Sequence, residues 1–443
     1  MKAFVLDPPR CTGCEACRVA CSIENRIPME RTWRSVHHTN LEHRPGLPAF
    51  HLSMACNHCA RPACLAGCPA TAYAKDPATG AVLLDDSRCI GCRYCSWVCP
   101  YDAPRFDPFQ GVMGKCTFCF DRILVGQAPA CASACPTGAL GVEERAAPLP
   151  EPEFPGIFIG TLGPALRIEQ ASIPFAPAMA PGDPDTVAGF EPGPPPPAKV
   201  SLRSEWTLWL FTLAALGLVG LHLGWVLGGP AWLPPWGVLA LGGLAAALST
   251  AHLGRPERAW RAVVNPRHSW LSREVLAFGT FLPAAALSLL LGRHGVLAWV
   301  GAALGILLLG SMDRLYQVAE HRPMWRLRSS DLLPAGLHLA ALVAGAWPAL
   351  GLLAVLRAAL FLHGAWRGRP ALGPPALVAR LLALGLPLLP LALGIPAWAR
   401  LVCFLAGEAL DRAGFYDGLE IPSPAALLHR RGAGFTSASA DPA

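Results

Sequence analysis

The chain has few charged residues for its length. Asp, Glu, Lys and Arg occupy only 15% of its 443 positions, whereas hydrophobic residues occupy 53%. Soluble globular proteins contain roughly 25% charged residues, so this composition disfavours a purely soluble protein. The length is also large for one domain, and we expect at least two regions of different character.

Several familiar motifs are missing. The sequence has no glycine-rich nucleotide-binding loop, no residue order typical of a hydrolytic triad and no segment resembling a molybdenum-binding fold. Residues 1–10 lack the apolar core of a secretory signal. The chain therefore shows no site for chemistry on a terminal substrate, and an extracellular disulfide framework is disfavoured.

Cysteine is nearly absent after residue 135, where only Cys403 remains, and the other sixteen fall in four groups of four. The groups are Cys11, Cys14, Cys17 and Cys21; Cys56, Cys59, Cys64 and Cys68; Cys89, Cys92, Cys95 and Cys99; and Cys116, Cys119, Cys131 and Cys135. The first and third have the spacing C-x2-C-x2-C-x3-C, at which three thiolates hold one [4Fe–4S] cube while the fourth reaches a neighbouring cube. At four thiolates per cube, the sequence predicts four cubes.

Two other uses of cysteine fit less well. Disulfides would suit a small secreted domain. Zinc sites usually join two C-x2-C pairs across a spacer, whereas these tight triplets crowd three thiolates together. Iron–sulfur clusters are therefore the favoured interpretation, and Cys403, within an apolar stretch, is interpreted as a small core residue.

The second, third and fourth groups each end in Cys-Pro, and the fourth lies in the sequence KCTFCFDR at residues 115–122. In these features and in the order of the groups, residues 11–136 resemble the four-cluster electron-transfer subunit of the DMSO reductase family. The resemblance implies an α+β domain over residues 1–145 in which two ferredoxin-like units are nested, one inside the other.

The resemblance also implies how the cysteines are shared among four ligand sets. These sets are Cys11, Cys14, Cys17 and Cys135; Cys21, Cys116, Cys119 and Cys131; Cys56, Cys59, Cys64 and Cys99; and Cys68, Cys89, Cys92 and Cys95. Some relatives replace a cysteine of the third group by tryptophan and hold a three-iron centre. Here Cys92 is intact, so four-iron cubes are expected throughout.

The composition changes after the cysteine region. Residues 146–200 are rich in proline and lack apolar periodicity, which predicts a linker, with an ordered strap as the alternative for parts of it. Residues 201–420 are predicted to form an all-α polytopic membrane domain, and residues 421–443 a tail. A bilayer requires about 20 apolar residues per helix, and eight spans are predicted: 206–228, 236–254, 275–292, 296–313, 332–347, 349–366, 377–393 and 397–416.

Arginine predicts the orientation. If residue 200 is cytoplasmic, most arginines after it fall in inside loops, whereas the outside loops hold little beyond Arg293 and Arg400. Because short loops rich in Lys and Arg stay inside, we expect a multi-pass protein of the inner (plasma) membrane with its cluster domain in the cytoplasm. Docking of the cluster domain or of lipid headgroups is an alternative reason for the same arginines.

The membrane half carries a second resemblance. The sequences HLGRP at 252–256 and SWLSRE at 269–274 are similar to the loop after the second helix of the DMSO reductase membrane anchor subunit, and residues 407–416 resemble that anchor's last helix. The resemblance implies that two polypeptides of the family are fused here.

A quinone exchanges two electrons and two protons, so its pocket needs titratable groups at the membrane boundary, where such groups are costly and functional. The candidates for a quinone site are His252, Arg255, Arg273, Glu274 and Glu408, followed by Arg258, Asp313, Arg314 and Tyr416. Structural roles compete with this interpretation: Glu274 could cap the third span, Glu408 could pair with Arg412, and His252 could bond a neighbouring helix.

Three other histidines, His222, His338 and His363, raise the question of haem b. The resembled anchor carries no haem, and isolated membrane histidines usually serve packing or hydrogen bonding. No haem is expected.

The resemblance implies a separate catalytic subunit with molybdopterin (bis-guanine dinucleotide) as partner, and contacts with lipid and quinone or menaquinone; no nucleic acid partner is expected. The chain would be a non-catalytic redox subunit of DMSO reductase or sulfite dehydrogenase type with its own quinone-reacting site. The family favours electron flow from menaquinol to an oxide such as DMSO, whereas the cytoplasmic orientation favours flow from a donor such as sulfite into the quinone pool. An iron–sulfur relay coupled to an ion transporter is the alternative, although no predicted span has paired central acidic residues.

Overall fold

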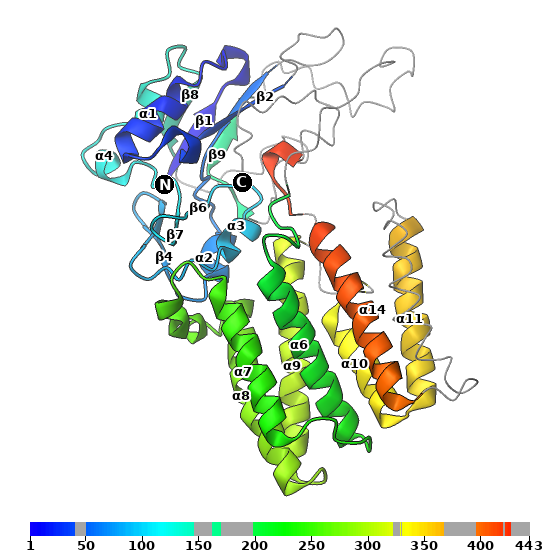
Figure 1. Cartoon of the computed structure of the whole chain (residues 1–443). Coiled ribbons are helices and arrows are strands. Elements are labelled where there is room, and N and C mark those ends of the chain that lie inside the picture. The colour runs from blue at the N-terminus through cyan, green and yellow to red at the C-terminus, as the bar shows by residue number, and fades with distance from the viewer. Residues whose placement is uncertain are drawn as a thin grey trace, which may run out of the picture. The chain divides into compact units, whose positions relative to one another are not determined.

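The structure, a computed structural model, describes residues 1–39, 50–145, 162–169, 198–321, 328, 330–366, 396–419 and 421–426, without the side chains of 361–366. The chain divides into two units, one of Met1–Pro197 with Ile421–Ala443 and one of Ala198–Glu420 (Figure 1). The first contains short strands and helices, and the second is helical.

A three-stranded sheet joins the two ends of the cysteine region in the first unit. Its order is β8 (Leu140–Glu144), β1 (Lys2–Leu6) and β9 (Leu166–Ile168). Strands β1 and β8 are antiparallel, and their register runs from Lys2 opposite Glu144 to Leu6 opposite Leu140. Because β1 precedes the first cysteine group and β8 follows the fourth, this pairing brings the two outer groups together.

Three two-stranded hairpins lie within this closed loop, namely β2 (Ser35–His38) with β3 (His51–Met54), β4 (Tyr73–Lys75) with β5 (Val82–Leu84), and β6 (Arg105–Asp107) with β7 (Val112–Gly114). Short helices carry or adjoin the cysteines: α1 (Ala16–Asn25), α2 (Ala63–Gly67), α3 (Tyr94–Trp97), α4 (Phe120–Leu124) and α5 (Ala130–Ser133). Two 3-10 turns complete the unit, η1 (Pro8–Arg10) and η2 (Met29–Arg31). The unit is thus ferredoxin-like and α+β, as predicted.

Part of the predicted linker forms a strand. Strand β9 lies inside it and pairs in parallel with β1, from Phe4 opposite Leu166 to Leu6 opposite Ile168. Backbone hydrogen bonds from Ala60 and Arg61 to Gly163 and Leu162 hold the same segment against the cysteine region. Leu166 and Ile168 are buried, so a short apolar stretch among the prolines suffices to fix a strand.

Seven helices of the second unit coincide with predicted spans, and the span at 377–393 lies outside the described residues. The helices are α6 (Trp206–Val226), α7 (Pro235–Ala251), α8 (Trp270–Leu291), α9 (Val296–Ala319), α10 (Leu332–Ala344), α11 (Trp347–Trp366) and α14 (Ala397–Asp417). A 3-10 helix, η4 (Pro256–Val263), follows α7. The third helix begins at 270 rather than at the predicted 275, so Arg273 and Glu274 lie within it.

Only part of this unit meets the requirements of a bilayer span. In the described ranges, α6, α8 and α9 are long and apolar enough, and α7 with η4 adds a fourth if that pair, bent by 109°, is one span. Helix α10 has only 13 residues, and α14 contains several charged residues. The structure therefore supports three or four spans of the eight predicted.

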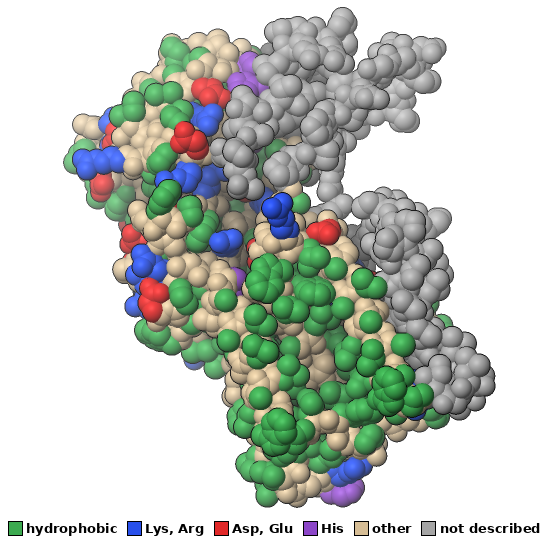
Figure 2. Space-filling model, in the orientation of Figure 1, with side chains coloured by type: hydrophobic (Ala, Val, Ile, Leu, Met, Phe, Trp, Pro, Cys, Tyr) green, Lys and Arg blue, Asp and Glu red, His purple; other side chains and the backbone are tan. Residues whose placement is uncertain are grey.

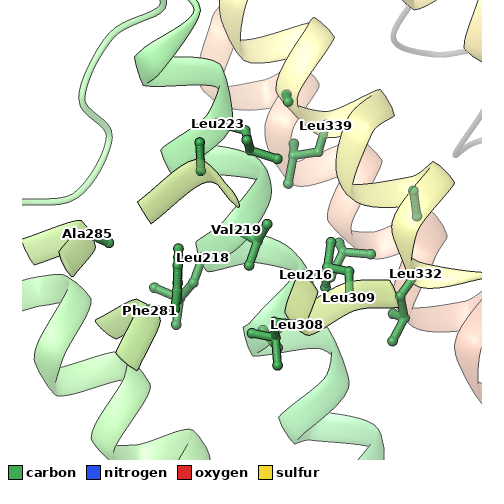
Figure 3. Packing of buried hydrophobic residues seen from close by; sticks show 14 of the residues in the cluster. Leu216, Leu218, Val219, Leu223, Phe281, Ala285, Leu308, Leu309, Leu332 and Leu339 are labelled. Carbon is green, nitrogen blue, oxygen red and sulfur yellow. The ribbon is translucent and has the colours of Figure 1, made fainter. Parts of the chain in front are cut away.

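The core of the helical unit is an apolar cluster shared by α6, α8, α9 and α10. Leu216, Leu309 and Leu332 meet within it, and Phe281 packs on the other side of α6 (Figure 3). The contact of α6 with α10 depends on glycine: a Cβ on Gly220 would lie 2.6 Å from Leu339, and one on Gly224 would lie 2.5 Å from Val343. Gly220 and Gly224 form a G-x-x-x-G pattern, which lets two helix backbones approach closely.

The outer surface of the helical unit is also apolar. Large side chains such as Leu244 on α7, Leu290 on α8 and Leu307 on α9 are exposed, and Figure 2 shows hydrophobic side chains over most of the visible face of these helices. An apolar surface of this extent is unfavourable in water and is suited to lipid. Together with the apolar helices, it indicates a membrane protein.

We predict that Gly220→Val weakens the helical unit by about 1–3 kcal/mol, because the new side chain must displace Leu339. Thermal unfolding in detergent measures the change. Gly217→Val is the matched control, since a Cβ at Gly217 meets nothing within 4 Å. Equal losses in both variants would show that glycine at 220 is not required by the contact with α10.

Candidate metal centres and a buried polar cluster

Two cavities in the first unit are each lined by cysteines of two different groups. One is lined by Cys11, Cys14, Cys17 and Cys135. The other is lined by Cys56, Cys59, Cys64 and Cys99. In each cavity, three cysteines of one group therefore meet the last cysteine of another.

The remaining eight cysteines also gather across groups. The thiols of Cys116 and Cys119 interact electrostatically with those of Cys21 and Cys131, and Cys116 also interacts with Cys56 of another set.

In the same way, Cys95 interacts with Cys68, Cys89 and Cys92. The structure thus places the members of each implied set near one another, and each set joins residues of two different groups.

The chemistry of these sites fits iron–sulfur cubes. All seventeen cysteines are free, without disulfides. A cube takes one thiolate at each of four corners, which agrees with four cysteines that line one cavity.

Backbone conformation shapes the sites through a repeated pattern. The second residue after the first cysteine of each group has a positive φ: Gly13 at 69°, His58 at 43°, Gly91 at 70° and Phe118 at 66°. The amides of His58, Gly91 and Phe118 donate hydrogen bonds to the sulfur atoms two residues earlier. A left-handed turn after the first cysteine therefore directs an N–H group at its sulfur.

A second repeat follows the Cys-Pro pairs. Thr71, Asp102 and Gly138, each three residues after a group's last cysteine, also have positive φ. Leu140 then donates to the sulfur of Cys135, and Ala72 to that of Cys68. The sequence does not predict the left-handed turns of either repeat, because only Gly13, Gly91 and Gly138 have a residue type that favours a positive φ.

Burial opposes ionisation of the free thiols. It raises the pKa of the Cys17 and Cys21 thiols, although the Arg34 guanidinium opposes the rise. Burial also raises the pKa of Cys92 to about 12. Since cysteine binds metal as the thiolate, metal binding at these sites releases protons and stabilises the fold.

In the helical unit, a buried polar cluster joins three helices. It contains Glu274 of α8, Tyr316 of α9, and Arg412 and Tyr416 of α14, all buried. The Tyr316 and Tyr416 hydroxyls lie 2.5 Å apart, and the Arg412 guanidinium lies 4.9 Å from the centre of the Tyr316 ring. Glu274 is within electrostatic range of Arg412 and Tyr316.

This cluster keeps unused donors. Arg412 donates through Nη1 to the Ser330 carbonyl, whereas its Nε and Nη2 atoms have no hydrogen-bond partner among the described residues. Glu274 does not cap its helix, because Ser269 is the N-cap residue and accepts from the Ser272 amide. A buried carboxylate and a guanidinium with spare donors suit a polar ligand.

Glu408 belongs to a different group. It forms an ion pair with Arg357 of α11, with Nη1 and Oε1 2.6 Å apart, and Arg357 also lies 3.3 Å from His338 Nδ1. The alternative pairing of Glu408 with Arg412 is therefore wrong, since Arg412 contacts aromatic rings and Ser330 instead. Arg357 was overlooked, although a single arginine within an apolar span is a signal of a buried site.

The other sequence candidates have local roles. Arg273 donates to the carbonyls of Pro266 and Arg267, and Arg255 lies 3.6 Å from Glu257. His252 is the half-buried C-cap residue of α7. Asp313 accepts from the amides of Leu332 and Leu333 and so caps α10.

Two arginines and two histidines remain. Arg258 lies at 4.0 Å from Glu257, and Arg314 donates to Gln317. Of the histidines considered for haem, His222 lies 3.2 Å from the Ala298 carbonyl. The side chain of His363 lies outside the described residues.

Comparisons with known proteins agree with this division of the sequence. Residues 48–145 match the family model of a 4Fe-4S dicluster domain, and residues 235–362 match that of the DMSO reductase anchor subunit (DmsC). The protein is 37% identical over 174 residues to the B subunit of anaerobic dimethyl sulfoxide reductase from Haemophilus influenzae, covering 33% of the present sequence and 82% of that subunit.

Other relatives belong to two kinds of complex. The B subunit of the Escherichia coli anaerobic dimethyl sulfoxide reductase is 39% identical over 145 residues, covering 31% of the present sequence and 70% of that subunit. The iron-sulfur subunit of E. coli formate dehydrogenase-O is 38% identical over 154 residues, covering 31% of the present sequence and 51% of that subunit.

We predict that Gly13→Ala lowers the iron content of the purified protein. A Cβ at residue 13 would lie 2.9 Å from the His51 ring and would add strain at a φ of 69° beside Cys11 and Cys14. Gly126→Ala is the matched control, because it has a φ of 77° but nothing within 4 Å. If both variants keep the same iron content, crowding at Gly13 does not matter.

Proposed function

Because this protein belongs to the family of the B subunit of anaerobic dimethyl sulfoxide reductase and continues into an anchor domain of the same system, we propose that it relays electrons between the membrane quinone pool and a separate molybdopterin catalytic subunit. The relay consists of four [4Fe–4S] clusters. The observation that carries the proposal is that Cys135 lines the same cavity as Cys11, Cys14 and Cys17. This arrangement joins the last cysteine of the fourth group to three cysteines of the first, which is the shared ligation that the proposed clusters need.

The four proposed ligand sets are those that the cysteine contacts favour. They are Cys11, Cys14, Cys17 and Cys135; Cys21, Cys116, Cys119 and Cys131; Cys56, Cys59, Cys64 and Cys99; and Cys68, Cys89, Cys92 and Cys95. Iron–sulfur cubes, when bound, exchange single electrons at potentials set by charge and by hydrogen bonds to sulfur. The backbone amides aimed at Cys56, Cys89 and Cys116 provide such hydrogen bonds.

The proposed quinone site lies around Glu274, Arg412 and Tyr416, with His252 near the end of the preceding helix. A quinone carbonyl can accept a hydrogen bond from the free Nε or Nη2 donor of Arg412. Glu274 can deliver or accept a proton in a site from which water is excluded. Arg255, Arg273 and Glu408 are omitted from this site, because each is engaged elsewhere.

The direction of electron flow depends on orientation. Our proposal puts the cluster unit in the cytoplasm, since the arginine-rich loops of the predicted membrane topology fall on the side where the linker joins the first span. Oxidation of a donor such as sulfite into the quinone pool suits this placement, whereas reduction of an oxide such as DMSO suits the opposite one. Protease accessibility of residues 146–160 in sealed inside-out and right-side-out vesicles distinguishes the two placements.

We predict that Cys135→Ser lowers the iron content from about sixteen to about twelve atoms per molecule, because one four-iron cube loses a ligand. Iron and sulfide analysis with EPR spectroscopy of the reduced protein measures the loss. Cys403→Ser is the matched control, since Cys403 lies in α14 outside the four sets. An unchanged iron content in the Cys135 variant would contradict the ligand assignment.

We predict that Glu274→Gln slows quinol-linked reduction of the clusters by about 10²–10⁴-fold, the usual contribution of a positioned proton donor or acceptor. Stopped-flow absorbance with a menaquinol analogue measures the rate. Glu257→Gln makes the same chemical change at an exposed carboxylate and should leave the rate unaltered. Cluster reduction by dithionite should be normal in both variants; equal rates with quinol would contradict the site.

A further inference from the structure

Arg34 is a buried cation with no carboxylate partner. Its side chain is 1% exposed, and it forms no ion pair with an Asp or Glu among the described residues. An unpaired buried charge is costly, because the protein interior solvates it poorly. The fold must therefore supply negative charge to Arg34 from some other source.

The contacts of Arg34 lead to a cysteine sulfur. Its Nη1 atom lies 3.0 Å from the Ser53 hydroxyl and 3.3 Å from the Ser53 carbonyl, and the Ser53 hydroxyl lies 3.3 Å from the sulfur of Cys17. Because Arg34 can only donate, Ser53 accepts from it and is free to donate its own proton to the sulfur.

The guanidinium also lies over an aromatic ring that connects it to the neighbouring set. Its central carbon is 4.6 Å from the centre of the Phe4 ring, Phe4 packs edge-on against Phe118, and the Phe118 amide donates to the sulfur of Cys116. The Nε and Nη2 atoms of Arg34 have no hydrogen-bond partner in the described part of the protein.

Four cysteine thiols interact electrostatically with Arg34, namely those of Cys131, Cys17, Cys116 and Cys21. Cys17 belongs to the first cavity, whereas the other three belong to the neighbouring set. Cys17 and Cys21 are also one turn apart on α1. Arg34 therefore interacts with cysteines of two proposed cluster sites.

We propose that Arg34 is a positioning residue that raises the reduction potentials of both clusters, the one held by Cys11, Cys14, Cys17 and Cys135 directly through Ser53 and the one held by Cys21, Cys116, Cys119 and Cys131 through its charge. This inference rests on the proposed function. A cube with four thiolates is anionic and gains a further negative charge on reduction, so a buried cation beside it favours the reduced form.

The test is a redox titration, followed by EPR spectroscopy, of the full-length protein in its membranes. Arg34→Met removes the charge at similar length, and Arg34→Lys keeps it. We expect Arg34→Met to disfavour reduction of these two clusters by at least tenfold, a fall of about 59 mV for one electron. Arg34→Lys should restore most of the potential of both clusters.

Lys115→Met is the matched control. Lys115 is buried and lines the cavity of Cys56, Cys59, Cys64 and Cys99. Because Lys115 also donates to the Cys116 carbonyl, the comparison uses the cluster of Cys11, Cys14, Cys17 and Cys135: replacement of Lys115 should shift the potential of the cluster in its own cavity and leave that one unmoved. A spectrum with the Cys135→Ser variant identifies the signal of the first cluster.

Ser53→Ala keeps the inference testable if Arg34→Met does not fold. We expect it to lower the potential of the first cluster alone, because only Cys17 receives the Ser53 hydroxyl. Unchanged potentials in both Arg34→Met and Ser53→Ala, with four clusters retained, would overturn the role of Arg34 and leave the proposed relay intact. A wild-type protein without these clusters would overturn both.

Discussion

The pairing of β1 with β8 is the interaction on which the cysteine unit depends. Five residue pairs, from Lys2 with Glu144 to Leu6 with Leu140, join the beginning of the sequence to the end of the cysteine region. Closing so long a loop costs entropy, although the cost grows only slowly with length. The buried Phe4, Leu6 and Leu140 offset part of that cost. When β1 and β8 are paired, Cys135 lies near Cys11. The three hairpins then lie within the loop that the two strands close.

Cation placement follows from the same closure. The unit buries Arg34 and Lys115 almost completely, and both lie beside cysteine sulfur rather than beside carboxylates. Hydrophobic packing alone would not select buried cations, because each loses its hydration. Anionic clusters would offset the lost hydration energy of these cations, so cluster binding and folding would stabilise one another. The burial of Arg34 and Lys115 is therefore explained only when the neighbouring cysteines are treated as metal ligands.

The helical unit obeys a different constraint. Between α6 and α10, glycines allow close contact, as expected where lipid, rather than water, surrounds the helices. Two groups of buried ionisable residues have opposite character. One is the ion pair of Arg357 with Glu408, which neutralises both charges, and the other is the cluster of Glu274 and Arg412, which retains spare donors. Arg357 and Glu408 satisfy each other's charge within the fold, whereas the spare donors of Arg412 are the basis of the proposed quinone site.

The sequence by itself determined the number and grouping of the cysteines, the apolar helices and the boundary near residue 200. These depend on spacing and composition, which are local. It also indicated Glu274, because a carboxylate at the edge of an apolar span is unusual. The left-handed residues His58 and Phe118 could not be predicted, since their residue types favour other conformations. The partners of Glu274, Glu408 and Arg34 were decided only by the tertiary structure. These partners are distant in the sequence. Which buried charges come into contact depends on how the helices and strands pack, and no local sequence pattern encodes that packing.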